Sequence, residues 1–331
     1  MSTLQEIRAK LQAQEAKSSG KGTFTKDLTT YAHWDLPEPG TSLLRFLPDS
    51  DPDNTFFWRE RQLIKLPFAG VKNDKDHKNV VVQVPCMDMW ERNSCPVITE
   101  VGPWFNDPNL ETLARSYWKK RTYLMQGFVV EDGLQAPQSP ENPIRKFIIS
   151  PQIFKVIKSA LLDPDMENNP TDFNHGTPFR INKTKNGQYA DYSTSNWARK
   201  ESPLTSEQLE AIKTYGLFNL NDFMPKKPNA EELNAIKEMF EASVNGELYD
   251  LDRWGKYYKP FGLGGADADR AESPKTESTK TVSIPKETPK AAPEKVETKK
   301  EVAAEPAEAT SSGGASAQDI LARIRRRSTE S

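Results

Sequence analysis

The chain has 331 residues, of which 36% are hydrophobic and 28% are charged, and its formal net charge is -2. No run approaches the roughly 18 consecutive apolar residues of a membrane-spanning helix, and residues 1–21 lack the layout of a secretory signal, so we expect a cytoplasmic protein without a membrane partner. Two cysteines exclude a disulfide-rich scaffold, and three histidines argue against a conventional metallohydrolase. The net charge excludes a uniformly basic nucleic-acid coat but allows a local basic groove.

The first 22 residues predict a short amphipathic arm before the globular core. Leu4, Ile7 and Leu11 recur at helical spacing with basic residues around them, and a Ser- and Gly-rich run at 18–22 follows. A helix of this length is not stable alone in water. We therefore expect residues 1–22 to order against their own core or against a neighbouring molecule.

The globular core is expected at residues 23–262, because every Phe, Trp and Tyr of the chain lies between Phe24 and Phe261. Within it, runs of β-branched and aromatic residues bounded by Pro, Asp, Asn and Gly predict strands. The predicted strands cover residues 42–47, 56–66, 79–84, 121–130, 145–149, 179–185 and 188–195. The last two flank the dipeptide Asn186-Gly187, which is a strong signal for a hairpin.

Three helices are predicted among these strands. One covers residues 152–162, and the other two begin behind capping boxes, at 206–215 after Thr205 and at 230–244 after Asn229. Many short strands with a few inserted helices predict a mainly β fold, most economically an OB-fold, which is a Greek-key barrel.

From residue 263 onward the composition changes to Ala, Glu, Lys, Pro, Ser and Thr. Such a segment cannot bury enough apolar surface to offset its chain entropy, so residues 263–316 are predicted to be a disordered linker. In residues 317–331, Ile320, Leu321 and Ile324 lie at helical spacing beside several arginines. This basic segment is interpreted either as a docking peptide for a partner or as a solvated tail.

The motifs of common enzymes are missing from the sequence, which indicates a non-catalytic protein. It has no GxxxxGK[ST] phosphate loop, no HExxH and no Gly-x-Ser-x-Gly elbow. Acidic groups such as Asp49, Asp51 and Asp53 could hold magnesium, but their Pro- and Asn-rich surroundings favour turn formation.

Cys86 and Cys95 lie close together in the sequence, and His77 precedes them. These three residues are the candidate metal ligands. A structural zinc takes four nitrogen or sulfur ligands, so the ligand count favours buried free thiols over zinc.

The strongest positive signal is a mixture of cations and aromatic rings on predicted strands. It occurs at residues 115–123, at 145–147 and around the predicted hairpin. Single-stranded nucleic acid suits this mixture, because cations neutralise its phosphates while rings stack on its unpaired bases. The candidate DNA-binding residues are Arg115, Tyr117, Trp118, Lys119, Lys120, Arg121, Tyr123, Arg145, Lys146, Phe147, Arg180, Lys183, Lys185, Tyr189 and Tyr192.

The predicted hairpin places its two tyrosines on opposite faces of the ribbon. A two-residue turn at the Asn-Gly dipeptide puts Tyr189 opposite Thr184. It puts Tyr192 opposite Ile181, so Tyr192 is the tyrosine that we expect in the core. Any single ring of the candidate set is more often part of a core than a platform for a base.

The order of these segments resembles the T-even bacteriophage gene-32-type single-stranded DNA-binding proteins. The matching stretches are Leu43–Pro48, Ser94–Val97, Lys119–Tyr123, Phe128–Val130, Arg145–Phe147 and Tyr189–Tyr192, within about residues 42–200. The resemblance implies an OB-fold core that contains a small zinc-bearing subdomain at 60–105. It also implies an N-terminal arm that binds the next molecule along the strand and a C-terminal tail that recruits replication and recombination proteins.

The resemblance also assigns roles to particular residues. The family's basic motif falls on residues 119–121, and its stacking rings fall on Tyr123, Phe147, Tyr189 and Tyr192. A leucine at 124 stands where the family has a tryptophan.

Two features depart from the family. Its zinc site uses one histidine and three cysteines, of which Cys86 and Cys95 match two, and His77 is the candidate replacement for the histidine. Its tail is acidic, whereas the chain here ends in a basic segment.

These observations lead to the hypothesis of a cooperative, sequence-independent single-stranded DNA-binding protein. It would coat and protect single strands in phage DNA replication, recombination and repair, in the cytoplasm of an infected bacterial cell. Its expected partners are single-stranded DNA, further copies of itself and phage proteins, and its binding requires no cofactor. The alternatives are a metal-dependent nuclease and a protein-interaction scaffold that binds RNA incidentally.

Overall fold

The computed structural model describes residues 28–74, 78–134 and 140–260. The predicted arm at 1–22, the linker at 263–316, the basic segment at 317–331 and the candidate ligand His77 lie outside these residues. In the described part of the chain, no helix is long and apolar enough to cross a membrane.

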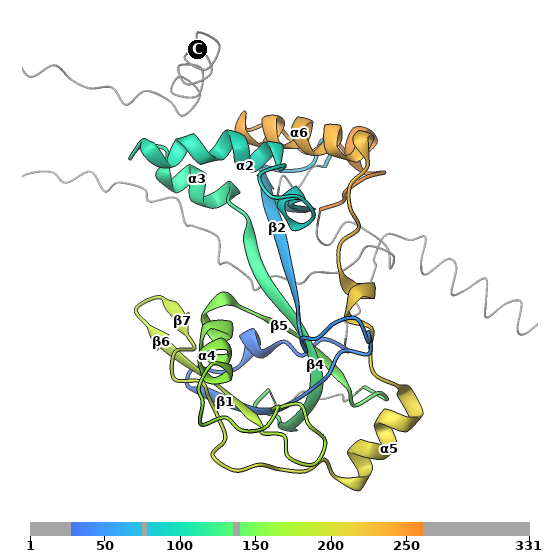
Figure 1. Cartoon of the computed structure of the whole chain (residues 1–331). Coiled ribbons are helices and arrows are strands. Elements are labelled where there is room, and N and C mark those ends of the chain that lie inside the picture. The colour runs from blue at the N-terminus through green and yellow to red at the C-terminus, as the bar shows by residue number, and fades with distance from the viewer. Residues whose placement is uncertain (1–27, 75–77, 135–139, 261–331) are drawn as a thin grey trace, which may run out of the picture. The chain divides into compact units, whose positions relative to one another are not determined.

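Among the described residues, eight strands are linked by antiparallel pairing. They are β1 (Gly40–Leu47), β2 (Arg59–Phe68), β3 (Val80–Pro85), β4 (Lys120–Glu131), β5 (Arg145–Ile149), β6 (Phe179–Asn186), β7 (Tyr189–Asp191) and β8 (Asn196–Trp197). Neighbouring strands follow the order β3-β2-β4-β1-β6-β7, while β5 pairs with β4 and β8 pairs with β6. β1 thus lies between strands that are distant in sequence, as in Greek-key folds. The antiparallel sheet with inserted helices confirms the predicted fold class (Figure 1).

The described helices include all three that the sequence predicts. They are α2 (Pro96–Val101), α3 (Glu111–Tyr117), α4 (Pro151–Leu161), α5 (Ser206–Tyr215), α6 (Ala230–Val244) and α7 (Leu251–Trp254), with short 3-10 helices at His33–Asp35, Met87–Met89, Gly102–Asn106 and Leu220–Phe223. The capping boxes are confirmed, because Thr205 and Asn229 each accept a hydrogen bond from the N–H three residues later, at 3.2 and 2.9 Å. The sequence does not predict α2 and α3, because helices as short as these show little hydrophobic periodicity.

Aromatic rings fill the main hydrophobic core. The ring of Phe46 on β1 has its centroid 5.7 Å from that of Phe147 on β5 and 5.8 Å from that of Phe179 on β6. Helix α4 packs against this core through side chains that include Ile153 and Ile157, one helical turn apart. Burial of one such side chain stabilises the fold by about 1.5–3 kcal/mol. The sheet and α4 therefore hold each other in place.

A buried arginine fastens the long segment between α4 and β6 to the sheet. The guanidinium of Arg45 on β1 donates hydrogen bonds to the backbone carbonyls of Phe46, Pro170 and Asp172. Gly176 lies so close that a Cβ atom there would be 2.0 Å from Nη2 of Arg45. Position 176 therefore requires glycine, and the arginine fixes the segment that leads into β6.

A second, smaller core lies among α2, α3 and α6, beside β2 (Figure 1). The rings of Trp104 and Phe240 stack with their centroids 5.9 Å apart, and the ring of Tyr117 meets both of them edge-on. The hydroxyl oxygens of Tyr117 and Ser243 are 2.9 Å apart. α6 therefore packs with helices from a much earlier part of the chain. Both α3 and α6 lie outside residues 60–105, the range expected for the subdomain.

The predicted register of the β6–β7 hairpin is wrong, because the two turn residues lie one position later in the chain than predicted. Asn186 pairs with Tyr189, and Thr184 pairs with Asp191, so the turn consists of Gly187 and Gln188. Gly187 has a φ of 62°. Glycine takes the first central position of the turn, where positive φ is needed and where a side chain would be strained.

Candidate nucleic-acid interface

Lys65, which is half-buried, and Lys120, which is more exposed, lie on one face of the paired strands β2 and β4. Lys120 stands opposite Leu63, and Lys65 follows Leu63 by two positions, so both lysines project to the same side of the sheet. Burial and the charge of Lys120 lower the pKa of Lys65, and burial lowers the pKa of Lys120. A phosphate would be stabilised where two cations are held together in this way. Lys65 is missing from the sequence prediction, because no local signal shows that β2 pairs with β4.

The other cations of residues 115–123 pair with carboxylates. Lys119 Nζ lies 2.6 Å from Asp88 Oδ2, and Arg121 Nε lies 3.0 Å from Glu60 Oε1. Arg115 pairs with a glutamate one turn earlier on α3. Exposed ion pairs contribute about 0–1 kcal/mol. A phosphate can therefore displace the carboxylates from Arg115 and Arg121, whereas Lys119 is held by a nearly buried partner.

Two of the three rings in the same segment lie inside the protein. Tyr117 belongs to the smaller core, and Tyr123 is buried with its ring stacked on that of Phe154. Trp118 is half-buried, and its ring centroid lies 5.0 Å from that of Phe105, which is partly exposed. Trp118 and Phe105 are therefore the rings at this place that can meet a base.

The β6–β7 hairpin exposes one ring and one cation near its turn. Tyr189 is 81% exposed, and Lys185 is exposed as well. Lys183 is buried, with its Nζ donating to two backbone carbonyls at 2.9 Å and lying 3.1 Å from Glu38 Oε1. Tyr192 is 8% exposed, in the core where the sequence places it. Lys183 and Tyr192 therefore have structural contacts here, and Tyr189 and Lys185 remain open to a ligand.

Residues 145–147 divide between surface and core. Phe147 is fully buried in the main core and offers no face to a base. The Nζ atom of Lys146 lies 4.0 Å from the ring centroid of Phe223, and Arg145 is half-buried and donates to the carbonyl of Leu28. The surface here thus presents a cation over a ring.

Arg180 lies in the wall of an open pocket of about 560 Å³. The pocket is lined by Arg180, Asn196, Trp197, Ala198 and Arg199. The last four residues are missing from the sequence prediction. Strand β8 is too short to be recognised, and its pairing with β6 is what places Asn196 opposite Arg180.

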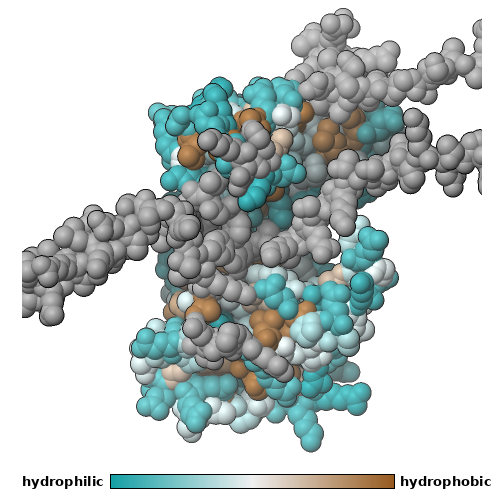
Figure 2. Space-filling model, turned by 180° about the vertical axis from the view of Figure 1, so that it is seen from behind, coloured by the Kyte–Doolittle hydropathy of each residue, from teal (hydrophilic) through white to brown (hydrophobic). Residues whose placement is uncertain are grey.

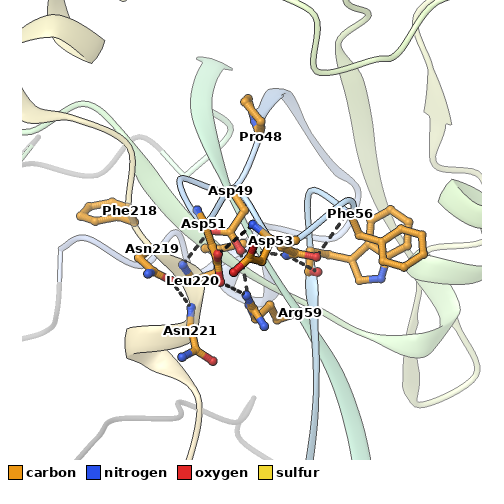
Figure 3. Close-up of polar contacts among 12 residues, drawn as sticks. Pro48, Asp49, Asp51, Asp53, Phe56, Arg59, Phe218, Asn219, Leu220 and Asn221 are labelled. Atoms are coloured by element: carbon orange, nitrogen blue, oxygen red, sulfur yellow. Dashed lines mark hydrogen bonds and ion pairs between the residues drawn. The ribbon is translucent and has the colours of Figure 1, made fainter.

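An exposed ring in the β1–β2 loop, packed on a partly buried one, is also missing from the sequence prediction. Phe56 is 56% exposed, and its ring centroid lies 4.7 Å from that of Trp58. Asp49 anchors this loop, since its carboxylate accepts from the N–H of Leu220 at 2.9 Å and from Nε of Arg59 at 3.3 Å. Figure 3 shows the ring of Phe56 pointing away from this network. Asp49 thus serves the turn, as predicted, and the loop holds an exposed ring.

Exposed rings are spread over several elements of the described surface. They include Phe56, Trp90, Phe105, Tyr189 and Tyr215. On the face shown in Figure 2, hydrophobic residues form separate groups among hydrophilic ones. Separate exposed rings can each stack on a base of a single strand, whereas a protein partner is usually bound by one broad apolar patch.

Cys86 and Cys95 are buried free thiols. A hydrogen bond between the two thiols, together with burial, raises the pKa of Cys86 far above its usual range, and the same hydrogen bond lowers the pKa of Cys95. No three His, Cys, Asp or Glu side chains are grouped to hold a metal ion in residues 28–74, 78–134 and 140–260. Two thiols are half of the ligand set of a structural zinc. The described residues therefore do not fit that metal.

Comparison with known protein families agrees with this surface. The model of the family described as "gp32 DNA binding protein like" matches residues 38–242, which is more than half of the chain. No curated protein matches the chain. The family match confirms the resemblance to gene-32-type single-stranded DNA-binding proteins, and it covers all the candidate DNA-binding residues. The chain therefore belongs to the gp32-like family of DNA-binding proteins.

Proposed function

We propose that this protein binds single-stranded DNA cooperatively and with little sequence preference. It coats and protects exposed strands during phage DNA replication, recombination and repair, in the cytoplasm of an infected bacterial cell. The observation that best supports DNA binding is the pair of Lys65 and Lys120 on one face of β2 and β4, in a chain that belongs to a DNA-binding family.

The mechanism combines electrostatics with stacking. Lys65 and Lys120 take a phosphate, and the condensed cations released from the strand favour binding at low salt. Exposed rings such as Tyr189 stack on bases whatever their identity, which accounts for the low sequence preference. Because a duplex offers no unpaired bases, the protein stabilises the single strand selectively and so destabilises duplex ends.

Two segments outside the described residues complete this proposal. Residues 1–22 contact the next molecule along the strand and produce the cooperativity. Residues 317–331, which are basic, dock on replication and recombination proteins. These roles rest on the amphipathic spacing of each segment and on the resemblance to the family.

We propose no catalytic step and no metal in this function. A metal-dependent nuclease would need carboxylates grouped around a cation, whereas Asp49 and its neighbours are engaged in turns and ion pairs. Incubation of the full chain with single-stranded DNA and magnesium is expected to leave the DNA intact. Cleavage that requires the metal would favour the nuclease.

The experiment that tests DNA binding is a titration of the full chain with poly(dT), followed by its intrinsic tryptophan and tyrosine fluorescence at two salt concentrations. We expect strong quenching that weakens as salt increases. The absence of quenching at low salt would contradict the proposal. Tighter binding to RNA of matched length than to DNA would instead favour a scaffold that binds RNA.

A further inference from the structure

The pocket between β6 and β8 carries charges that the fold itself does not use. Its walls hold Arg180 and Arg199, and its volume is about 560 Å³. Other arginines of the chain, such as Arg59, Arg121 and Arg253, form ion pairs with carboxylates. No carboxylate of the described residues pairs with either pocket arginine. The pocket is therefore lined by two arginines whose charges no carboxylate of the described residues neutralises.

Trp197 joins the lining of the pocket to the main core. The indole Nε1 of Trp197 is buried, and none of the described residues accepts its hydrogen bond. The ring itself is fixed, because it packs edge-on against Phe46 and Phe179, with centroids 5.9 and 5.0 Å away. Trp197 stands opposite Phe179 in the β6–β8 pairing, so its side chain lies on the core side of the sheet, whereas Asn196 and Arg180 share the other face. The two arginines are therefore the charged residues that the pocket offers to an anion.

The position of the pocket connects it to the hairpin. Asn196 is opposite Arg180, and Tyr189 is opposite Asn186. Arg180 and Asn186 are six residues apart on β6, so Arg180 and Tyr189 project from the same face of the ribbon. Alternate residues of β6 on this face are half-buried or exposed, whereas Phe179, Ile181 and Lys183 on the other face are buried. The pocket and the exposed ring thus lie on one side of β6, roughly 20 Å apart along the strand.

We propose that this pocket binds a backbone phosphate of single-stranded DNA, through Arg180 and Arg199, while Tyr189 stacks on a base elsewhere on the same strand. The inference rests on the proposed function and extends it, because it assigns a second phosphate site in addition to the Lys65 and Lys120 pair. Arginine suits this site, since its planar group offers two parallel hydrogen bonds to the oxygens of a phosphate.

The test compares Arg180→Gln and Arg199→Gln with Lys237→Gln in the full chain. Lys237 is an exposed lysine on α6 that does not line the pocket, so it controls for loss of one surface charge. Binding to oligo(dT) is measured over a series of salt concentrations. Each pocket variant is expected to bind more weakly and to reduce the slope of log K against log salt by about 0.7, the value for one lost phosphate contact on a single strand. Lys237→Gln is expected to match the wild type.

Two further measurements separate this role from a structural one. Thermal unfolding of Arg180→Gln and Arg199→Gln is expected to match that of the wild type, because their guanidinium groups have no carboxylate partner to lose. Trp197→Phe, which alters a ring on the core side of the sheet, is expected to keep the wild-type slope of log K against log salt.

Each alternative outcome overturns the assignment in a recognisable way. If the pocket variants keep the wild-type slope while the wild type binds oligo(dT), the pocket is not a DNA site and the proposed function stands. If these variants change the affinity for inorganic phosphate or thymidine monophosphate but not for oligo(dT), the site serves a free phosphate. If the wild type does not bind oligo(dT), both the proposed function and the pocket assignment fail.

Discussion

Exposure decides which ring of this protein can meet a base. The residue types of Tyr189, Tyr192 and Phe147 are equally suited to stacking, but the fold leaves only Tyr189 of these three exposed. Tyr192 contacts the ring of His33, and Phe147 contacts the rings of Tyr31 and Phe46. The sequence identifies candidate rings as a class. It cannot identify the exposed ones, because exposure depends on which strands pair.

Tyr189→Ala and Phe147→Ala should therefore have opposite effects. Loss of an exposed stacking ring is expected to weaken binding to oligo(dT) by about 1–3 kcal/mol without a change in thermal stability. Loss of a fully buried ring is expected to destabilise the fold by about 3–5 kcal/mol. Fluorescence titration and urea unfolding of the two variants measure these effects. Unchanged DNA affinity of Tyr189→Ala would remove this tyrosine from the interface.

His33 makes the stability of the fold depend on pH. It is fully buried, and burial is the main cause that lowers its pKa from 6.5 to about 4. The unfolded chain therefore binds this proton more readily than the folded chain, so stability is complete above about pH 6.5 and falls as the pH decreases toward 4. Between pH 7.5 and 5 we expect a loss of about 2 kcal/mol.

Urea unfolding at these two pH values checks the role of His33. The control is His175→Asn, which alters an exposed histidine and should keep the pH dependence of the wild type. His33→Gln should lose most of this dependence. An equal pH dependence in His33→Gln and wild type would assign the effect to other groups.

At the scale of elements, the prediction succeeds where the signal is local. α5 and α6 begin at their capping residues, and β5 has the predicted bounds, because caps, turn residues and short β-branched runs act on nearby residues. Pairing between distant elements leaves no such local signal. The sequence prediction of the candidate site therefore missed Lys65, Phe56 and Arg199, because strand pairing or a loop network positions each of them.

The paired strands β2 and β4 offer a direct test of phosphate binding. Lys65→Gln and Lys120→Gln should each reduce the slope of log K against log salt for oligo(dT) by about 0.7. Lys237→Gln on α6 is again the matched control. The double variant should lose less than the sum of the two if both lysines share one phosphate. Slopes equal to that of the control would exclude a phosphate between these lysines.

Gly176 tests the connection between α4 and β6. Gly176→Ala places a methyl group against the buried guanidinium of Arg45, and overpacking of this kind costs about 1–3 kcal/mol. Gly102→Ala is the control, since nothing lies within 4 Å of a Cβ atom at that position. Differential scanning calorimetry should show a lower Tm for Gly176→Ala alone. An unchanged Tm would mean that the segment moves away from Arg45 without cost.

At the scale of the whole molecule, cooperativity is predicted to reside outside the described core. Deletion of residues 1–22 should leave the affinity for an oligonucleotide that fits one molecule within about twofold, because the core contacts to DNA remain. The same deletion should flatten the isotherm on poly(dT), because neighbouring molecules lose their contact. Fluorescence titrations on short and long DNA measure both effects. A steep isotherm without the arm would place the contact between neighbours within the core.

The three pairings of β4 determine how the sheet unfolds. It pairs with β2 over residues 120–124, with β5 over 123–127 and with β1 over 126–131. Since three ladders share this one strand, its amide hydrogens are released only when the sheet as a whole comes apart. The amides of β4 should thus be the slowest to exchange with deuterium. A protease that cuts within β4 would disrupt its pairing with β1, β2 and β5 together.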